Sequence, residues 1–309
     1  MWDFDLLAAV RAIEKSMAYV LYRLLICLGA ALGYLLATLA GAGTLVGFAS
    51  LAKNASSLGP IGAVFGFALF AYLMYKIRPT WLNAVNVPQL ALLADQERGV
   101  TLPTGKAQID YGKQRTAACF PSTAGLFALD EAIRQTQRDM ADFHPCHRLA
   151  VDQPRVKKYL NLTLQRLSAL NHQTLLAWHF FSGSDQPWRS AAEGLAVHEQ
   201  HFDGMTKNRL VATLFSWLGF LGFYPLLLAG IGILVEGIPI NFSFWPWVFA
   251  GVFAWAIKAA FFDAIVEAAM MEYFFSLARK ETGIPSGEAL YRQSDAYREI
   301  RQQSGQSLE

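Results

Sequence analysis

Charged residues are scarce in this chain of 309 residues. Asp, Glu, Lys and Arg make up 16% of it, against roughly 25% in soluble domains, while apolar residues reach 54%. The net charge of +2 is too small to indicate a nucleic-acid partner. Three cysteines, Cys27, Cys119 and Cys146, imply no disulfide framework. The composition therefore favours a membrane protein and excludes a fold held together by disulfides.

Short catalytic motifs are also missing. The chain has no CxxC pair, no HExxH and no aspartate-rich loop. Residues 104–106, Thr-Gly-Lys, are similar to the end of a phosphate-binding loop, but Ala107 stands where a Ser or Thr is needed, so we expect a turn. Cys119 has no base nearby in sequence and is not expected to be a nucleophile. The sequence contains no complete catalytic set, and we expect no cofactor.

Four apolar segments are present near residues 18–50, 58–75, 210–235 and 245–264. About 20 apolar helical residues cross a bilayer core of roughly 30 Å, because a helix satisfies its own backbone hydrogen bonds there. We therefore predict an all-α polytopic membrane protein. Two transmembrane hairpins, with four helices in total, flank a helical cytoplasmic region.

Basic residues indicate the orientation of these spans. The connectors at residues 51–59 and 236–244 contain one basic residue, Lys53. The other ends of the spans carry six: Lys76, Arg78, Lys207, Arg209, Arg279 and Lys280. Positive charge accumulates on the cytoplasmic side. We therefore expect a multi-pass protein of the inner (plasma) membrane, with both termini in the cytoplasm.

Five parts follow from this topology. Residues 1–17 form an amphipathic helix, which lies either at the membrane interface or against the protein's own cytoplasmic part. Residues 18–78 form the first hairpin, and residues 79–209 form the cytoplasmic region. Residues 210–278 form the second hairpin, and residues 279–309 form a cytoplasmic tail with a short solvated helix. Apolar spacing in the middle region predicts helices over about 126–140, 160–178 and 188–202.

Glycines in the first hairpin recur at intervals of four, a spacing that lets membrane helices approach closely. Such packing occurs within one molecule or at a subunit interface, and we favour the first because one hairpin supplies both helices. The glycines concerned are Gly29, Gly33, Gly41, Gly43, Gly47, Gly62 and Gly66.

Three charged residues near the end of the last apolar segment could form an ion path: Lys258, Asp263 and Glu267. At about 100° per residue, Asp263 and Glu267 share a helix face, whereas Lys258 is turned away from Glu267. We therefore expect Lys258 to extend toward the cytoplasm and both carboxylates to meet interfacial water.

Histidines raise the alternative of a metal site. His144, Cys146 and His147 are adjacent in sequence, and His198 and His201 are three residues apart on a predicted helix, a spacing that suits one metal ion. The other interpretation is that His198 is a buried, hydrogen-bonded core residue.

Residues 102–113, followed by Leu126, Phe127 and Asp130, resemble a segment of a prokaryotic family of multi-helix integral membrane proteins without an assigned activity. Residues 187–190 and 262–264 are similar to that family too. The resemblance implies the topology above and no mechanism. Glu267 departs from it, since an apolar residue is expected there, and this weakens a shared role in conduction.

We therefore expect a non-enzymatic inner-membrane scaffold or assembly subunit of a membrane complex, with the lipid bilayer and a homo-oligomer or other membrane proteins as partners. The first alternative is an oligomeric channel or transporter with acidic residues at its cytoplasmic mouth. The second is a metal-dependent membrane enzyme built on the histidines.

Overall fold

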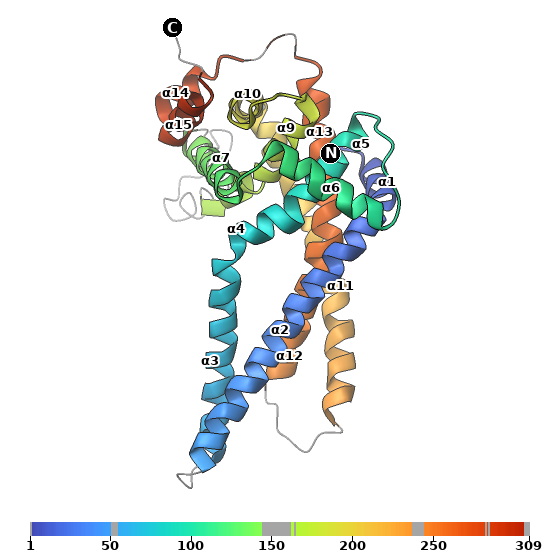
Figure 1. The fold of residues 1–309 in the computed structure, drawn as a ribbon, viewed down its shortest axis with the longest axis vertical. Coiled ribbons are helices and arrows are strands. Elements are labelled where there is room, and N and C mark those ends of the chain that lie inside the picture. Colours follow the sequence, from blue (N-terminus) through green and yellow to red (C-terminus); the bar gives the residue numbers. More distant parts are fainter. Residues whose placement is uncertain are drawn as a thin grey trace, which may run out of the picture. The chain divides into compact units, whose positions relative to one another are not determined.

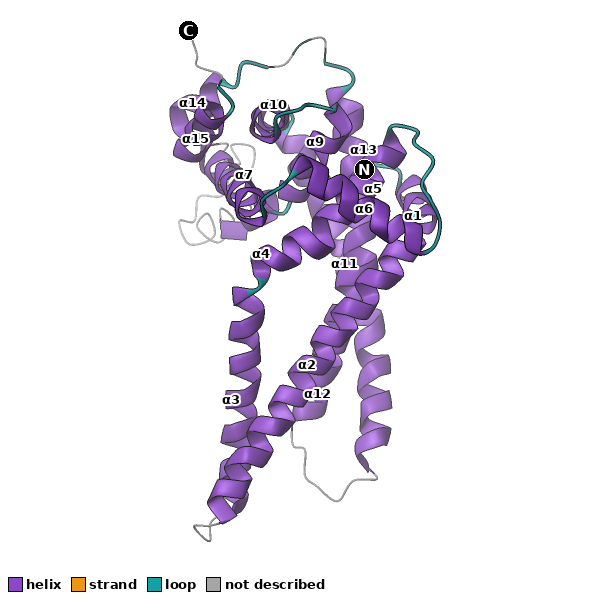
Figure 2. Cartoon of the chain, in the orientation of Figure 1, coloured by secondary structure: helices purple, strands orange, loops and turns teal. Residues whose placement is uncertain are grey.

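The computed structural model describes residues 2–50, 55–143, 162–163, 165–236, 244–281, 283 and 285–305. Every regular element in these residues is a helix, and no strand occurs among them (Figure 2). The predicted all-α fold is therefore confirmed for the described part of the chain.

Four stretches of helix are long and apolar enough to cross a membrane: Met17–Phe48, Leu58–Lys76, Phe202–Leu234 and Trp245–Ala278. The first three belong to α2 (Met17–Ser50), α3 (Ala55–Lys76) and α11 (Phe202–Glu236) (Figure 1). The fourth joins α12 (Trp245–Ile257), a π-helical turn η2 (Lys258–Phe262) and α13 (Asp263–Ala278). The four predicted spans are confirmed as helices that fit a multi-pass membrane protein, and the last two extend beyond the predicted apolar segments.

The chain divides into two compact units. We call residues 20–81 and 216–263 the apolar unit, and residues 1–19, 82–215 and 264–309 the large unit. One boundary falls between α4 (Arg78–Trp81) and the following helical turn, and the other three fall inside α2, α11 and α13, so each of these three helices contributes residues to both units.

Small side chains allow close helix packing in the apolar unit. Cys27 and Ala31 of α2 form a buried cluster with Ala256 and Ala260 of the last span. A short helix, α4 (Arg78–Trp81), ends the first part of the unit. Large apolar side chains point outward, with Leu218 65% and Ile233 72% exposed. This distribution is typical of a surface in contact with lipid or with other helices.

The large unit is built around α5 (Val87–Glu97), whose residues from Val87 to Asp95 are all buried. A π-helical turn, η1 (Leu82–Asn86), leads into α5, which packs against α6 (Lys106–Cys119) and α9 (His172–Ser182). Because α5 is buried on every side, it has no exposed polar face and its sequence shows no clear amphipathic period. Its sequence therefore did not single it out.

One predicted helix is interrupted. Helix is present at residues 165–169, a turn follows at Leu170 and Asn171, and α9 begins at His172. The backbone N–H of Asn171 donates to the Ser168 carbonyl, so the chain tightens into a turn there. The prediction of one long helix over residues 160–178 is therefore wrong in its second half. Residues 144–161 and 164 lie outside the described chain.

The C-terminal part packs into the large unit. Helices α14 (Glu288–Gln293) and α15 (Asp295–Gln303) bury Leu290, Tyr297 and Ile300, and α15 contacts α7 (Thr123–Phe143) and α10 (Pro187–Gln200). The prediction of a solvated helix is therefore wrong, because α15 is amphipathic and its apolar side completes the core.

Asp5 caps the N-terminus of helix α1 (Leu6–Lys15), and its carboxylate accepts hydrogen bonds from the backbone N–H groups of Leu7 and Ala8. Ala9 and Ile13 are buried, and α1 contacts α5 within the large unit. Leu7 remains exposed on the other side of the helix. The packing alternative therefore accounts for one face of this helix, and the exposed face is free for an interfacial role.

Candidate functional site

The π-helical turn η2 creates an ion pair between a buried lysine and a partly buried aspartate within the apolar unit. Lys258 Nζ lies 2.7 Å from Asp263 Oδ1, and Lys258 is 6% exposed. Residues five apart lie on different faces of an α-helix, but a π-helical turn closes its hydrogen bonds between residues i and i+5. The local change of helix type thus brings the ammonium and carboxylate groups together.

Two indole rings and a hydroxyl complete the surroundings of this pair. Ser216 donates a hydrogen bond to the same Asp263 oxygen. Lys258 Nζ lies 4.8 Å from the ring centroid of Trp255 and 5.5 Å from that of Trp217. Aromatic faces attract a cation, most strongly away from water. The ammonium group is therefore held by one carboxylate and two rings from helices α11 and α12.

This arrangement corrects the expected geometry of Lys258. The Lys258 side chain is buried and does not extend toward water. It pairs with Asp263, although an ideal α-helix would place the two residues on different faces. The insertion of η2 changes the helical phase between Lys258 and Asp263, and uniform helical periodicity cannot anticipate such a turn.

Glu267 pairs with a different residue, Arg209 of α11, within the large unit. Arg209 Nη2 lies 2.7 Å from Glu267 Oε1, and both residues are almost fully buried. Several buried polar atoms of these helices have no hydrogen-bond partner among the described residues: Arg209 Nε and Nη1, Glu267 Oε2 and the hydroxyl of Thr206, three residues before Arg209. Such atoms commonly bind ordered water. The pair therefore ties α11 to α13 and retains hydrogen-bonding capacity.

The predicted packing glycines fall into two groups. A Cβ added to Gly41 would lie 2.2 Å from the Gly62 carbonyl oxygen, and a Cβ added to Gly66 would lie 2.0 Å from the Ala37 carbonyl oxygen. Gly62 makes the reciprocal approach to Gly41, and at Gly33 the obstacle is the ring of Phe70. Nothing lies within 4 Å of an added Cβ at the other three, Gly29, Gly43 and Gly47.

The two described histidines that the sequence offers for a metal site, His198 and His201, each have a different partner. His198 Nε2 lies 3.3 Å from Asn171 Nδ2, and its ring is in edge contact with Phe202. His201 Nε2 lies 2.9 Å from Glu281 Oε1. Among the described residues no group of three His, Cys, Asp or Glu side chains could hold a metal ion. His144, Cys146 and His147 lie outside the described residues, so the full set remains a hypothesis.

A Ser and His contact that the sequence did not reveal joins α9 to α10. His179 Nδ1 donates to Ser190 Oγ at 2.9 Å, and the Ser190 hydroxyl donates to the Pro187 carbonyl. Burial, followed by the charge of Arg115, lowers the pKa of His179 to about 4. Ser190 is fully buried. The hydroxyl is therefore closed to a substrate, and the His179 nitrogen beside it donates a proton rather than accepting one, so the contact stabilises the helix pair.

Cys119 is also unsuited to nucleophilic chemistry. Burial raises the pKa of its thiol. This effect is larger than the opposite effect of the positively charged Arg115 guanidinium, 3.9 Å from the sulfur atom. Arg115 itself is paired with Asp95 at 3.1 Å, and Tyr111 donates to the same carboxylate oxygen. A protonated thiol is a weak nucleophile. The expectation from sequence that Cys119 is not a nucleophile therefore agrees with its surroundings.

A second buried network joins α7 to α9. Arg134 Nε donates to Asp130 Oδ2 at 2.8 Å, and Arg134 Nη2 donates to His172 Nε2 at 2.7 Å. His172 Nδ1 donates to the Ala169 carbonyl, which fixes the tautomer. The four-residue spacing of Asp130 and Arg134 was the one signal of this network in the sequence. The network fixes the start of α9 against α7.

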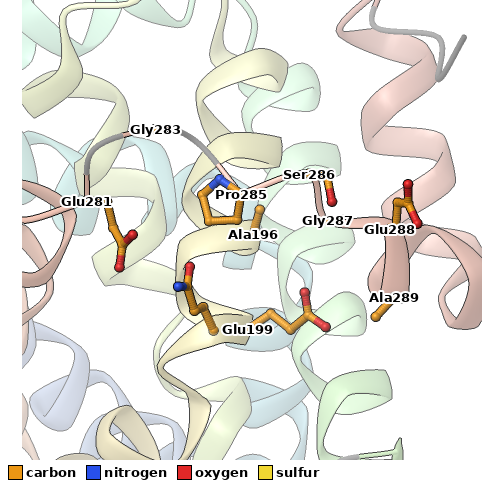
Figure 3. A pocket seen from close by; sticks show the side chains of 10 residues that line it. Ala196, Glu199, Glu281, Gly283, Pro285, Ser286, Gly287, Glu288 and Ala289 are labelled. Atoms are coloured by element: carbon orange, nitrogen blue, oxygen red, sulfur yellow. The ribbon is translucent and has the colours of Figure 1, made fainter.

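An acidic pocket of about 710 Å³ lies between α10 and the segment that leads to α14. Figure 3 shows Ala196 and Glu199 of α10 on one side and Pro285, Ser286 and Gly287 on the other. Glu281 and Glu288 also line it, and burial raises the pKa of Glu199. Two of these carboxylates have basic partners, since Glu281 lies 2.9 Å from His201 and Glu288 lies 3.1 Å from Arg292.

Comparison with known proteins gives no match: no protein-family model, no curated protein and no solved structure is similar to this chain.

Proposed function

We propose that this protein is a non-enzymatic inner-membrane scaffold, or an assembly subunit of a membrane complex. The observation that carries the proposal is the pairing of charge in the long helices. Lys258 is bound to Asp263, and Glu267 is bound to Arg209. The Arg209 and Glu267 pair joins α11 to α13, and removal of either partner leaves an uncompensated buried charge. Lys258 and Asp263 lie in one helical span and contact Trp217 and Ser216 of α11.

The proposed topology consists of two transmembrane hairpins with both termini in the cytoplasm. Four apolar helices and the nearly uncharged connectors at residues 51–59 and 236–244 support it. In this arrangement residues 79–209 and 279–309 are cytoplasmic and present their helices to partners.

Exposed apolar surface supports assembly with other membrane helices. Of the residues in the most apolar part of the Phe202–Leu234 span, 6% are buried. In addition, an added Cβ at Gly43 meets open space. Small residues on an open helix face favour close approach by a second helix.

The test combines oligomeric mass in detergent with cysteine cross-linking in cells. Single cysteines are placed on a background without Cys27, Cys119 and Cys146, at the exposed positions Gly43 and Leu218 and at the buried control Ala256. We expect cross-linked products from an exposed position and none from Ala256→Cys. A strict monomer without adducts at either exposed position would overturn the proposal.

A second candidate function, an oligomeric ion or proton path, is favoured by one observation. The π-helical turn places Lys258, Asp263 and Ser216 together inside an apolar helix pair, and π-helical turns are frequent at functional sites. Flux across liposomes should then fall in Asp263→Asn and Lys258→Met. Absence of flux in the unmodified protein removes this candidate.

A further inference from the structure

The helices α2 and α3 form an apolar groove of about 700 Å³ within the apolar unit. Its lining includes Ala40, Gly41 and Thr44 of α2 and Gly66, Leu69 and Tyr72 of α3. The two backbones approach closely at Gly41 and Gly66, and both glycines also line the groove. The groove therefore lies beside the close contact of the two helices.

The chemistry of the groove suits a hydrocarbon chain. Its exposed surface is almost entirely carbon, and the Thr44 hydroxyl donates to the Ala40 carbonyl of its own helix at 2.8 Å. All of the lining residues lie within the candidate spans Met17–Phe48 and Leu58–Lys76. The groove is therefore open to the hydrocarbon core of a bilayer.

A cation marks one end of the groove. Tyr72 lines it, and Lys76, one helical turn later, is exposed with Nζ 5.4 Å from the Tyr72 ring centroid. The ring holds the ammonium group near the point where α3 ends. A phosphate group at this position would meet positive charge while its acyl chain extends along the groove.

We propose that this groove binds an anionic phospholipid, with an acyl chain between α2 and α3 and the phosphate beside Lys76. A second copy of the chain is a weaker fit. Residues 17–50 and 55–76 contain no Asp or Glu, so a copy that docked through the same two helices would bring no anion to Lys76. An anionic lipid satisfies the apolar groove and its basic end together.

Native mass spectrometry of the full-length protein tests this proposal. The protein is equilibrated in detergent with equal amounts of phosphatidylglycerol and phosphatidylcholine that carry the same acyl chains. We expect preferential retention of phosphatidylglycerol. Lys76→Gln should lower that preference about fivefold, which corresponds to about 1 kcal/mol for one basic residue. Ala40→Phe, at an exposed position in the groove, should reduce retention of both lipids.

Two matched variants control for position and charge. Leu39→Phe adds the same aromatic ring to an exposed site on α2 outside the groove, and Lys280→Gln removes an exposed lysine after the last span. Both should retain lipid as the unmodified protein does. Equal retention of the two lipids, or equal effects of Lys280→Gln and Lys76→Gln, would overturn the proposal.

An Ala40→Phe variant that loses oligomeric mass with lipid retention unchanged would also overturn it, because a second copy would then occupy the groove. If Ala40→Phe does not fold, the surface variant Lys76→Gln decides the outcome alone.

Discussion

Arg209 and Glu267 lie in long apolar helices, and the buried guanidinium and carboxylate groups face each other. Removal of both charges from water costs free energy, which their attraction and hydrogen bond offset in the complete pair. The loss of one partner leaves the other charge buried and unpaired. A single substitution should therefore be more harmful than replacement of the whole pair.

The first prediction concerns this pair. Arg209→Met should lower the free energy of unfolding by about 3–5 kcal/mol, whereas Arg209→Met combined with Glu267→Leu should restore most of the loss. Arg292→Met is the control, because the Arg292 and Glu288 pair is exposed and should contribute less than about 1 kcal/mol. Denaturant titration in detergent measures all three variants. A double variant as unstable as the single one would contradict the argument.

The second prediction concerns His179, whose pKa is lowered from 6.5 to about 4 by burial and then by Arg115. Above pH 6.5 the imidazole is neutral in the folded and unfolded chains. Between pH 6.5 and about 4 the unfolded chain binds a proton that the folded chain does not, so the free energy of unfolding falls as the pH falls. The loss is at most about 3 kcal/mol.

His179→Gln removes this titration. The decline in unfolding free energy between pH 6.5 and pH 4 should be shallower than in the unmodified protein, as measured by denaturant titration at several pH values. Parallel curves for the two proteins would show that His179 does not contribute in this range.

At the scale of helices, the sequence predicts elements better than it predicts contacts. The four-residue spacing of the glycines indicated close packing but not which glycines face a neighbour. Gly41 and Gly66 meet backbone, whereas Gly43 faces open space, since residues two apart on a helix point in different directions. Likewise, α5 was missed because it is buried on all sides, and the phase change at η2 has no periodic signal.

The third prediction tests the glycine contact. Gly41→Ala places a Cβ 2.2 Å from the Gly62 carbonyl oxygen, so α2 and α3 must separate, at a cost of about 1–3 kcal/mol. Gly43→Ala adds the same methyl group to the same helix where no atom lies within 4 Å, and should be neutral or slightly stabilising. Thermal unfolding in detergent compares them. Equal melting temperatures would contradict the close approach.

At the scale of the whole molecule, the number of spans and the helical class were predictable because about 20 apolar residues have few alternatives to a membrane helix. The division into units was less accessible. The boundary at Asp263 lies inside the last span, and the apolar residues of α13 beyond it, such as Phe274, are buried in the large unit. Hydrophobicity alone does not distinguish a lipid-facing residue from a core residue.

The fourth prediction concerns topology. On the cysteine-free background, Leu58→Cys and Phe244→Cys, both at exposed positions near the connectors, should react with a membrane-impermeant maleimide in intact cells. Gln114→Cys and Gln302→Cys, exposed in the large unit, should react only after the membrane is permeabilised. The reverse labelling pattern would place the large unit outside the cytoplasm.

The large unit consists of three stretches of chain that are separated by the two stretches of the apolar unit. Helix α15 is synthesised after all four apolar helices, so its contacts with α7 and α10 are the last to form. Until then the surfaces of α7 and α10 that α15 covers remain open on the nascent chain. All four apolar helices are therefore available for insertion before this core closes, and a prematurely terminated chain keeps an unfinished interior that quality-control proteases can recognise.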